Sequence, residues 1–171
     1  RKHDMGRRSV SNNGRTSCGR LVAWKRGKAF TGIEWLFAVK TGKSPGEIVM
    51  EEGAIVFREH EIGRIKSVSG TENAVISCGG GAIVNRINID RLKQNGVIVL
   101  LTAPLETIIE RTATQNKRPI IHRGDPRTEL IRLWEERSCL WGPAADIVID
   151  TSEKSVETVV DEIALILQDI R

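Results

Sequence analysis

The feature that most constrains the fold is a regular alternation of short apolar runs with longer helical segments. The runs NAVISC (73–78), VIVLL (97–101) and DIVID (146–150) are typical of strands that are buried on both faces. Successive strands joined by a helix pair in parallel, so the pattern predicts an α/β fold with a three-layer, doubly wound parallel sheet. No repeat or low-complexity linker interrupts the pattern, and we expect residues 1–171 to form a single domain.

The ends of several helices are marked in the sequence. Ser44 precedes Pro45, and Glu47 follows three residues after Ser44, which is the spacing of a capping box. Gly96 is the expected C-terminal stop of a helix that begins near residue 88. Ser155 is the expected N-cap of the last helix, which has an apolar stripe along one side.

Composition narrows the class of protein. Hydrophobic residues make up 40% and charged residues 28% of the chain, as in globular rather than disordered proteins. No apolar run reaches the roughly 20 residues that cross a bilayer, and the start has no apolar signal-peptide core. The three widely spaced cysteines form no disulfide or metal pattern and indicate reduced thiols. We therefore expect a cytoplasmic protein with no zinc site and no membrane attachment. Independently of composition, we expect a monomer.

The net charge of +4 is unevenly distributed along the chain. Residues 1–30 have nine lysines and arginines against Asp4 alone, which gives this segment +8 and the remainder −4. A basic end suits nucleic acid, a membrane surface or nucleotide phosphates, and it also occurs as a solvated face. Aromatic residues make up only 4% and tyrosine is absent, so we expect no nucleic-acid partner that binds by base stacking.

Three consecutive glycines, residues 79–81, follow the run NAVISC directly. Ligands of doubly wound sheets bind at the carboxyl ends of the strands, where this triplet lies. Glycine has no Cβ and lets another group approach the backbone closely. A plain turn seldom needs three glycines in succession, so the triplet indicates a binding site.

Several arginines are candidates for binding anions. Arg58 and Glu61 lie one helical turn apart, and taken alone this pair is typical of a surface ion pair. Arg118 lies in a polar loop before a proline, a common setting for a phosphate clamp. Arg137 is expected at the end of a helix, where a cation also suits the helix dipole.

The segment SVSNNGRTSC (9–18) has the spacing of a phosphate-binding P-loop, G-x-x-x-x-G-K-[ST]. In that register Ser9 replaces the first glycine, Gly14 is the second, Arg15 replaces the lysine and Thr16 supplies the hydroxyl. The segment therefore occupies the position of a P-loop in a degenerate form.

In combination, these motifs resemble those of the shikimate kinase family, whose members are small P-loop kinases of the nucleoside-monophosphate-kinase type. The resemblance runs from Gly14 to Arg171 and rests on TGKSPGEI, FREHE, ISCGGGA, ERTATQNKRPII and EERSCLW in the family's order. It implies ATP-dependent phosphorylation of the shikimate 3-hydroxyl in aromatic amino-acid biosynthesis, with Mg2+ as cofactor and shikimate and ATP as the small-molecule partners.

The resemblance also implies roles for individual residues. The positions that match the shikimate site are Glu34, Arg58, Gly80, Gly81 and Arg137. The positions that match the ATP site are Asn12, Asn13, Gly14, Arg15, Thr16, Ser17, Arg111 and Arg118. Within this set Arg15 and Arg118 match catalytic residues, Arg118 being the lid arginine, Arg111 lies against adenine, and Thr16 is the metal ligand.

The chain departs from the family pattern near its start. RKHDMGRR (1–8) does not read as the apolar first strand that the family has before the P-loop, so residues 1–13 are atypical. Asn12 replaces a further P-loop glycine, and Arg15 cannot reproduce the compact ammonium of lysine. Where the family has two aspartates, one beside the metal and one on substrate hydroxyls, this chain has Gly32 and Glu34.

These departures leave several hypotheses open. The first is a shikimate kinase whose nucleotide half is weakened, and the second is a non-catalytic homologue that binds shikimate or a protein partner. A third is a kinase of another small molecule, against which the set Arg58, Gly80, Gly81 and Arg137 argues because it suits a polyhydroxy carboxylate. An error in the coding sequence upstream of about residue 14 would also produce an intact substrate half beside an altered P-loop.

Overall fold

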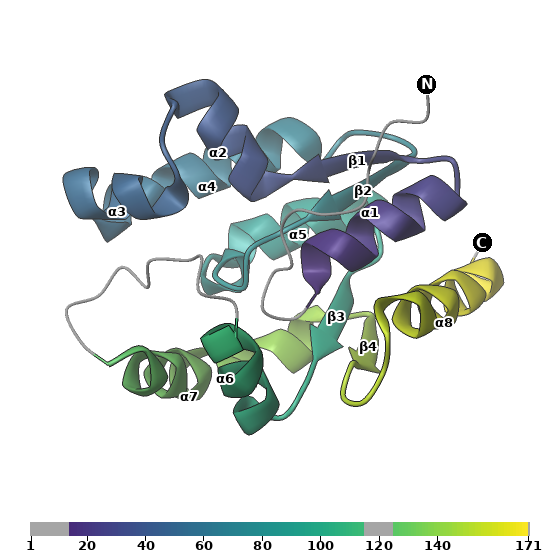
Figure 1. Cartoon of the computed structure of the whole chain (residues 1–171). Helices are drawn as coiled ribbons and strands as arrows, with labels where there is room; N and C mark the ends of the chain where they lie inside the picture. Colours follow the sequence, from purple (N-terminus) through teal and green to yellow (C-terminus); the bar gives the residue numbers. More distant parts are fainter. Residues whose placement is uncertain (1–13, 115–124, 171) are drawn as a thin grey trace, which may run out of the picture.

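The computed structural model describes residues 14–114 and 125–170 (Figure 1). Its strands are β1 (Ala29–Gly32), β2 (Ala74–Ser77), β3 (Val99–Thr102) and β4 (Ile147–Asp150). Its α-helices are α1 (Arg15–Lys25), α2 (Ile33–Thr41), α3 (Pro45–Glu52), α4 (Ala54–Val68), α5 (Arg86–Asn95), α6 (Leu105–Thr114), α7 (Pro126–Ala144) and α8 (Val156–Asp169). A short 3-10 turn, η1 (Ala82–Val84), follows the triple glycine.

All four strands pair in parallel, as the sequence predicts. β1 pairs with β2, with Ala29 opposite Ala74, and β3 pairs with β4, with Val99 opposite Ile147. In the described residues the two pairs form separate two-stranded sheets rather than one continuous sheet. Figure 1 shows the β1–β2 pair above the β3–β4 pair. The sequence analysis missed β1, because its segment AFTG has one large apolar residue and becomes a strand only by pairing with β2.

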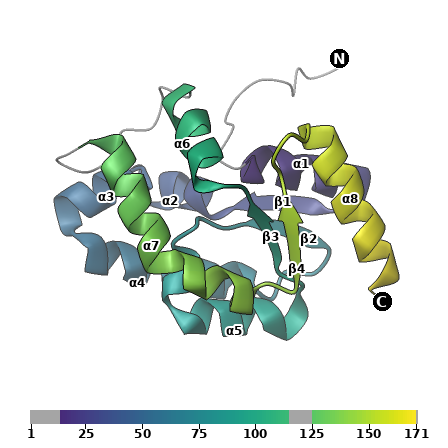
Figure 2. The same ribbon diagram turned by 90° about the horizontal axis from the view of Figure 1, so that it is seen from below.

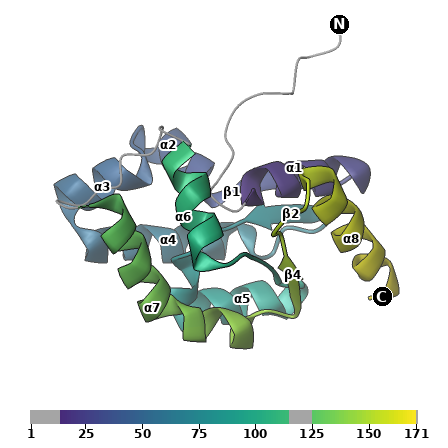
Figure 3. The same cartoon turned by 60° about the horizontal axis from the view of Figure 1, so that its bottom comes forward.

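Helices cover both faces of the strands, which gives the three expected layers. Val75 and Ile76 are neighbours in β2, and successive strand residues point to opposite faces. Val75 packs against a core formed by α1, α8, β3 and β4, in which Cys18, Val160 and Ile149 are buried. Figures 2 and 3 both show α1 and α8 side by side over this face.

A second core lies on the opposite side of β2. It contains Ile33 and Phe37 of α2, Ile48 of α3 and Ile65 of α4, and Ile76 packs against it. Phe37 also stacks on Phe57 of α4, with 5.1 Å between the ring centroids. One strand therefore contributes to two cores, as a central strand of a doubly wound sheet does.

The predicted helix ends are confirmed in all three places. The Ser44 hydroxyl accepts from the Glu47 N–H while the Glu47 carboxylate accepts from the Ser44 N–H, which completes the capping box of α3. The Ser155 hydroxyl caps α8 by accepting from the Thr158 N–H. Gly96 ends α5 in an extended conformation, with φ −146°, rather than the left-handed one that favours glycine. The chain turns directly toward β3 there, so no left-handed cap forms.

No helix in the ranges 14–114 and 125–170 combines the length and the apolar character needed to span a membrane.

Candidate active site

The best-defined polar cluster of the structure is centred on Arg58 and Glu61 of α4. The Arg58 guanidinium donates to the Glu61 carboxylate over 2.7 Å, and the Glu61 side chain is only 4% exposed. The sequence taken alone favoured a surface ion pair, which is wrong, because α4 turns this face inward against the end of β2. A buried carboxylate needs a partner, and here it holds the guanidinium in place.

The triple glycine lies directly against this ion pair. A Cβ on Gly81 would come 2.6 Å from Nη2 of Arg58, closer than real contacts allow. A Cβ on Gly79 would lie 4.0 Å from carboxylate oxygens of both Glu34 and Glu61. Gly81 therefore leaves room for the Arg58 guanidinium at the carboxyl end of β2, where Glu34 and Glu61 lie close to Gly79.

Arg137 of α7 approaches the same cluster from another helix. It lies near enough to Arg58 and Glu61 for their charges to shift its pKa. The sequence placed Arg137 at a helix end, but α7 continues to Ala144, so the side chain projects from the helix interior. The indole N–H of Trp141, one turn further along α7, donates to the Gly80 carbonyl over 3.2 Å and fixes α7 against the glycines.

Burial and neighbouring charges shift the pKa values of Glu61 and Arg137 in the cluster. Burial raises the pKa of Glu61, and the charges of Arg58 and Arg137 oppose that rise. Burial lowers the pKa of Arg137, and the neighbouring charge of Arg58 lowers it further. Two guanidiniums share one buried carboxylate, so a second carboxylate from a ligand would balance the charge.

A cavity of about 260 Å³ lies beside this cluster. It is lined by Arg15 and Thr16 at the start of α1 and by Gly32 and Glu34 at the junction of β1 and α2. Arg15 also reaches the glycines, because a Cβ on Gly80 would lie 3.5 Å from its Nη1. The expected phosphate-binding residues and Glu34 thus meet at one cavity, although they are far apart in the sequence.

The start of α1 has the features of an anion-binding helix end. Gly14 is the N-cap and has φ 67°, a left-handed conformation that side chains rarely adopt. The first N–H groups of a helix point outward along its axis and its dipole places partial positive charge there. Arg15, Thr16 and Ser17 form the first turn of this helix. Such a terminus suits phosphate, in agreement with the P-loop position predicted from the sequence.

Gly32 occupies the N-cap position of α2 and has an extended backbone, with φ −101° and ψ 126°. A Cβ there would make only ordinary contacts with Phe30 and Trp35, at 3.8 and 3.9 Å. Nothing in the local structure requires glycine at this position. The cavity beside Thr16 therefore lacks a carboxylate that the backbone would accommodate.

Arg111 of α6 is anchored at the end of β4. Its guanidinium donates to the Thr151 hydroxyl and to the Thr151 carbonyl, each over 2.9 Å. The Thr151 hydroxyl in turn donates to the Thr102 carbonyl at the end of β3. Arg111 is thus held with its side chain at the carboxyl ends of both strands.

Some expected site residues lie outside the described residues, namely Asn12, Asn13 and Arg118. Of the remaining expected residues, Arg111 lies apart at the ends of β3 and β4, and the others fall into two groups, one around Arg58 and one around Arg15. The sequence analysis did not assign a role to Glu61 or Trp141, although both hold the first group together. The only signal for Glu61 was its place one turn after Arg58, and periodicity does not show which face of α4 is buried.

Comparison with known proteins agrees with this arrangement. The family model described as shikimate kinase matches residues 11–168. A shikimate kinase from Pelotomaculum thermopropionicum is 34% identical over 156 residues, covering 91% of this chain and 90% of the relative.

Solved structures give the same answer. A shikimate kinase from Acinetobacter baumannii in complex with shikimate superposes with a TM-score of 0.86 at 28% identity, covering 94% of this chain and 89% of that one. A shikimate kinase from Aquifex aeolicus superposes with a TM-score of 0.76 at 30% identity, covering 95% of this chain and 94% of that one. The fold is that of a P-loop α/β kinase. The chain therefore belongs to the shikimate kinase family.

Proposed function

We propose that this protein transfers the γ-phosphoryl group of ATP to the 3-hydroxyl of shikimate. The observation that carries this proposal is the cluster of Arg58, Glu61 and Arg137 against Gly81 at the carboxyl end of β2. It combines two guanidiniums with a single buried carboxylate, and it lies next to a helix N-terminus that suits phosphate. The two parts match a small hydroxylated carboxylic acid and a nucleotide.

In this proposal the shikimate carboxylate binds between Arg58 and Arg137. Each guanidinium can donate two parallel hydrogen bonds, and the ligand carboxylate neutralises their excess charge. Glu61 is a positioning residue, because its carboxylate holds the Arg58 guanidinium in place. The backbone of Gly80 and Gly81 lines the site, and a side chain at Gly81 would collide with the Arg58 guanidinium.

Glu34 is placed to act on the reacting hydroxyl. Its carboxylate lines the cavity that contains Arg15 and Thr16, and it lies close to Gly79. We infer that Glu34 accepts a hydrogen bond from the 3-hydroxyl and receives its proton. The hydroxyl oxygen then forms a bond to the γ-phosphorus while the bond to the β-phosphate oxygen breaks and ADP leaves.

The nucleotide phosphates would lie at the start of α1, where Gly14, Arg15, Thr16 and Ser17 are positioned. Arg15 supplies positive charge toward both the cavity and the glycines. Arg111 lies across the ends of β3 and β4, a position that suits the adenine. We assign the same nucleotide role to Asn12, Asn13 and the lid residue Arg118 from the sequence.

The residues present fit Mg2+ with fewer side-chain ligands than the family pattern supplies. Mg2+ prefers oxygen ligands and is commonly held by one or two carboxylates together with substrate phosphates. Thr16 offers a hydroxyl in the cavity, whereas Gly32 offers no side chain and Glu34 is assigned to the substrate hydroxyl. Elsewhere among the described residues no group of three acidic, histidine or cysteine side chains forms a metal site. When bound, Mg2+ would neutralise charge on the phosphates.

A second candidate function is supported by the same cavity. A homologue that binds shikimate without phosphorylating it would keep Arg58 and Arg137 and tolerate the loss of a carboxylate at Gly32. Arg15 also favours this candidate, because it has a planar guanidinium instead of the ammonium of lysine. The two candidates differ in turnover and agree in shikimate binding, so they can be separated.

We also propose that the protein acts as a cytoplasmic monomer. Its three cysteines are free thiols, as expected in a reducing compartment. Light scattering on the purified chain, with and without shikimate, measures the oligomeric state directly.

The test is a coupled assay of ADP release with ATP, Mg2+ and shikimate, combined with calorimetry for each ligand alone. We expect ADP release that depends on shikimate. We also expect that the affinity for shikimate is near that of an ordinary shikimate kinase, whereas the affinity for ATP is weaker than in such a kinase. Binding of shikimate without any turnover would establish the non-catalytic homologue. Tight ATP binding with no shikimate binding would refute both candidates.

Matched arginine variants make this test specific. Arg58→Ala and Arg137→Ala should each weaken shikimate by about 1.5–3 kcal/mol, the range for a hydrogen bond to a charged group. Arg132→Ala is the control, because Arg132 is on the same helix as Arg137 but is half exposed and pairs with Glu129. Equal losses in all three variants would mean that the arginines act through general charge rather than through the site.

A further inference from the structure

The turn formed by the triple glycine can adopt two forms that present different groups to the proposed active site. The Ala82 N–H donates to the Gly79 carbonyl over 3.1 Å, which closes a four-residue turn with Gly80 and Gly81 at its centre. Gly81 has φ −86° and ψ −10°, close to the values for the third residue of a type I turn. The structure therefore has this turn in its type I form.

Glycine at position 81 makes the alternative, a type II turn, readily accessible. A type II turn differs from type I in the orientation of its central peptide, and it requires a positive φ at its third residue, where glycine is preferred. Because glycine adopts positive and negative φ about equally well, the local sequence favours neither form strongly. The choice depends on which groups bond to the central peptide, which joins Gly80 to Gly81.

Among the described residues, this central peptide is held by Trp141 of α7. The indole N–H of Trp141 donates to the Gly80 carbonyl over 3.2 Å. The other two glycine carbonyls accept from backbone groups of their own segment, Gly79 from the Ala82 N–H and Gly81 from the N–H two residues after Ala82. Rotating the central peptide to the type II form would turn the Gly80 carbonyl away from the indole and break this hydrogen bond. Trp141 therefore favours the type I form.

A second tryptophan holds the Trp141 ring in position. Trp134 lies two helical turns earlier on the same side of α7. Its ring meets that of Trp141 edge to face, with 5.3 Å between the centroids and 69° between the planes. Residues seven positions apart are separated by about 10 Å along a helix, so the two rings meet over the intervening turn, which carries Arg137. Packing within α7 thus directs the indole at the glycines.

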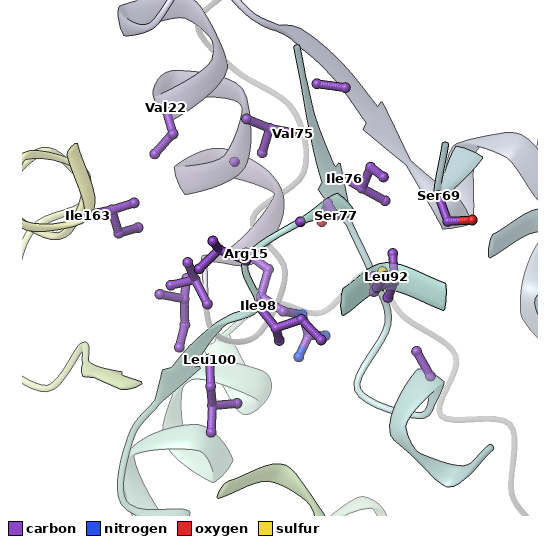
Figure 4. A pocket seen from close by; sticks show the side chains of 18 of the residues that line it. Arg15, Val22, Ser69, Val75, Ile76, Ser77, Leu92, Ile98, Leu100 and Ile163 are labelled. Carbon is purple, nitrogen blue, oxygen red and sulfur yellow. The ribbon is translucent and has the colours of Figure 1, made fainter. Parts of the chain in front are cut away.

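The hydrogen bond between Trp141 and Gly80 lies where the two halves of the site meet. Gly80 and Trp141 belong to the wall of a cavity of about 790 Å³ between β2 and β3, and Figure 4 shows Arg15 on the same wall. The next residue, Gly81, lies against the Arg58 guanidinium. The turn therefore lies between the arginine assigned to the phosphates and an arginine assigned to shikimate.

The orientation of the central peptide also sets the direction of the Gly81 N–H. In a trans peptide the C=O and N–H bonds point in opposite directions, so this N–H points away from Trp141. No described residue accepts a hydrogen bond from it. The Gly81 N–H is therefore available to a ligand that binds beside Arg58.

We propose that Trp141 is a positioning residue that holds the Gly79–Ala82 turn in its type I form and thereby directs the Gly81 N–H at an oxygen atom of bound shikimate. Trp141 touches neither substrate and acts through the Gly80–Gly81 peptide. The inference rests on the proposed function for the identity of the ligand, whereas the form of the turn does not depend on any ligand.

The first test measures the turn in the full chain without ligand. The dihedral angles of a type I turn bring the amide protons of Gly80 and Gly81 close together, and those of a type II turn separate them. Nuclear Overhauser spectra of isotope-labelled protein should show a strong contact between these two protons in the parent. The contact should be severalfold weaker in Trp141→Phe, which keeps an aromatic ring but has no donor. An unchanged contact in Trp141→Phe would overturn the proposal.

The second test measures the binding of each substrate by calorimetry. Trp141→Phe should weaken shikimate binding about tenfold, as expected for the loss of a hydrogen bond to the ligand, and should leave ATP binding unchanged. Weaker shikimate binding with an unchanged Gly80–Gly81 contact would mean that Trp141 acts by placing Arg137. That outcome would also refute the proposal.

Two further variants supply a second probe and a control. Trp134→Leu leaves the donor in place but removes the ring that holds it, so the amide contact should weaken and shikimate affinity should fall about threefold. Trp24→Phe is the control, because Trp24 is 72% exposed near the end of α1 and should affect neither measurement. Equal losses in Trp24→Phe and Trp141→Phe would contradict a specific role for Trp141.

The two tests separate this inference from the proposed function. If the parent binds no shikimate, the proposed function fails, and the amide contact still shows whether Trp141 sets the form of the turn. If the parent and Trp141→Phe bind shikimate equally tightly, the proposed function stands and this inference is wrong.

Discussion

At the scale of single residues, Gly81 makes the closest approach to a side chain among the glycines of the described residues, and that side chain is Arg58. The guanidinium occupies the space that a side chain at Gly81 would need. The Arg58 side chain is flexible at its far end, so an added methyl group would displace it rather than disrupt the backbone. The identity of residue 81 therefore affects ligand binding more than it affects folding.

We predict that Gly81→Ala weakens shikimate binding by about 1.5–3 kcal/mol, because Arg58 would lose its place beside the ligand carboxylate. Calorimetry measures this change, and thermal unfolding should show a nearly unchanged protein. Gly63→Ala is the control, since a Cβ there meets nothing within 4 Å. A Gly81→Ala protein that bound shikimate normally would show that Arg58 does not contact the ligand.

Gly32 presents the opposite case, since its backbone would accept a side chain but has none. We predict that Gly32→Asp raises kcat/KM for Mg2+-ATP about tenfold, equivalent to about 1.4 kcal/mol, by adding a carboxylate beside Thr16. Steady-state kinetics at saturating shikimate measures the change. Arg15→Lys restores a compact ammonium. Because both groups act on the same phosphates, the gain in the double variant should exceed the sum of the gains in the two single variants.

Gly32→Asn is the matched control for this substitution. Aspartate and asparagine are both good N-caps, so either would stabilise α2 by a few tenths of a kcal/mol relative to glycine. Only aspartate brings negative charge to the metal. An equal gain from both variants would mean that helix capping, and not metal binding, improves the reaction.

At the scale of secondary structure, α3 shows how a local sequence can define an element. Ser44 and Glu47 exchange hydrogen bonds with each other's backbone at the start of the helix. The backbone hydrogen bond from Ser44 lowers the pKa of Glu47. The hydrogen bond between the Ser44 N–H and the Glu47 carboxylate therefore stabilises the fold fully above the ordinary glutamate pKa. This stabilisation is lost as the pH falls through the lowered pKa of Glu47 in the folded protein.

We predict that Ser44→Ala lowers the free energy of unfolding by about 1 kcal/mol, the usual value for a lost N-cap. Chemical denaturation at neutral pH measures it. Shikimate affinity should not change, because α3 lies outside the cluster at the triple glycine. Ser44→Asp should retain most of the stability, since aspartate also caps helices, and an equal loss in both variants would argue against the cap.

At the scale of the whole molecule, the cores divide the three thiols into two classes. Cys18 lies inside the core between α1 and α8, and Cys139 is exposed on α7. Burial raises the pKa of Cys78 to about 12, and Glu61 contributes to the rise. Burial also raises the pKa of Cys18, with a smaller effect from Glu157.

We predict that iodoacetamide at about pH 8 modifies Cys139 in the folded protein and leaves Cys18 and Cys78 unmodified, because the thiolate is the reactive form. Mass spectrometry of the intact protein should show one adduct, and three adducts in denaturant. Cys139→Ser should remove the single adduct of the folded protein. Rapid modification of Cys78 would show that the end of β2 is open to solvent.

Much of the fold could be predicted from local patterns. Three of the four strands are continuous apolar runs, and the capping signals at Ser44 and Ser155 act within a single turn. β1 could not be predicted in this way, because AFTG becomes a strand through pairing with residues more than 40 positions away. The helix end at Gly96 was predicted, but its extended conformation depends on where β3 begins.

The sequence by itself determined the parallel α/β class, the family through its ordered motifs, and most residues of the candidate site. These follow from local periodicity, turn chemistry and residue identity, which need no knowledge of distant contacts. Tertiary structure alone decided that Glu61 is buried, that the Arg58 guanidinium lies against Gly81, and that a cavity of about 790 Å³ lies between β2 and β3. Each of these features depends on packing between segments far apart in the chain. A charge is buried, a side chain collides or a cavity forms only once those segments are in contact.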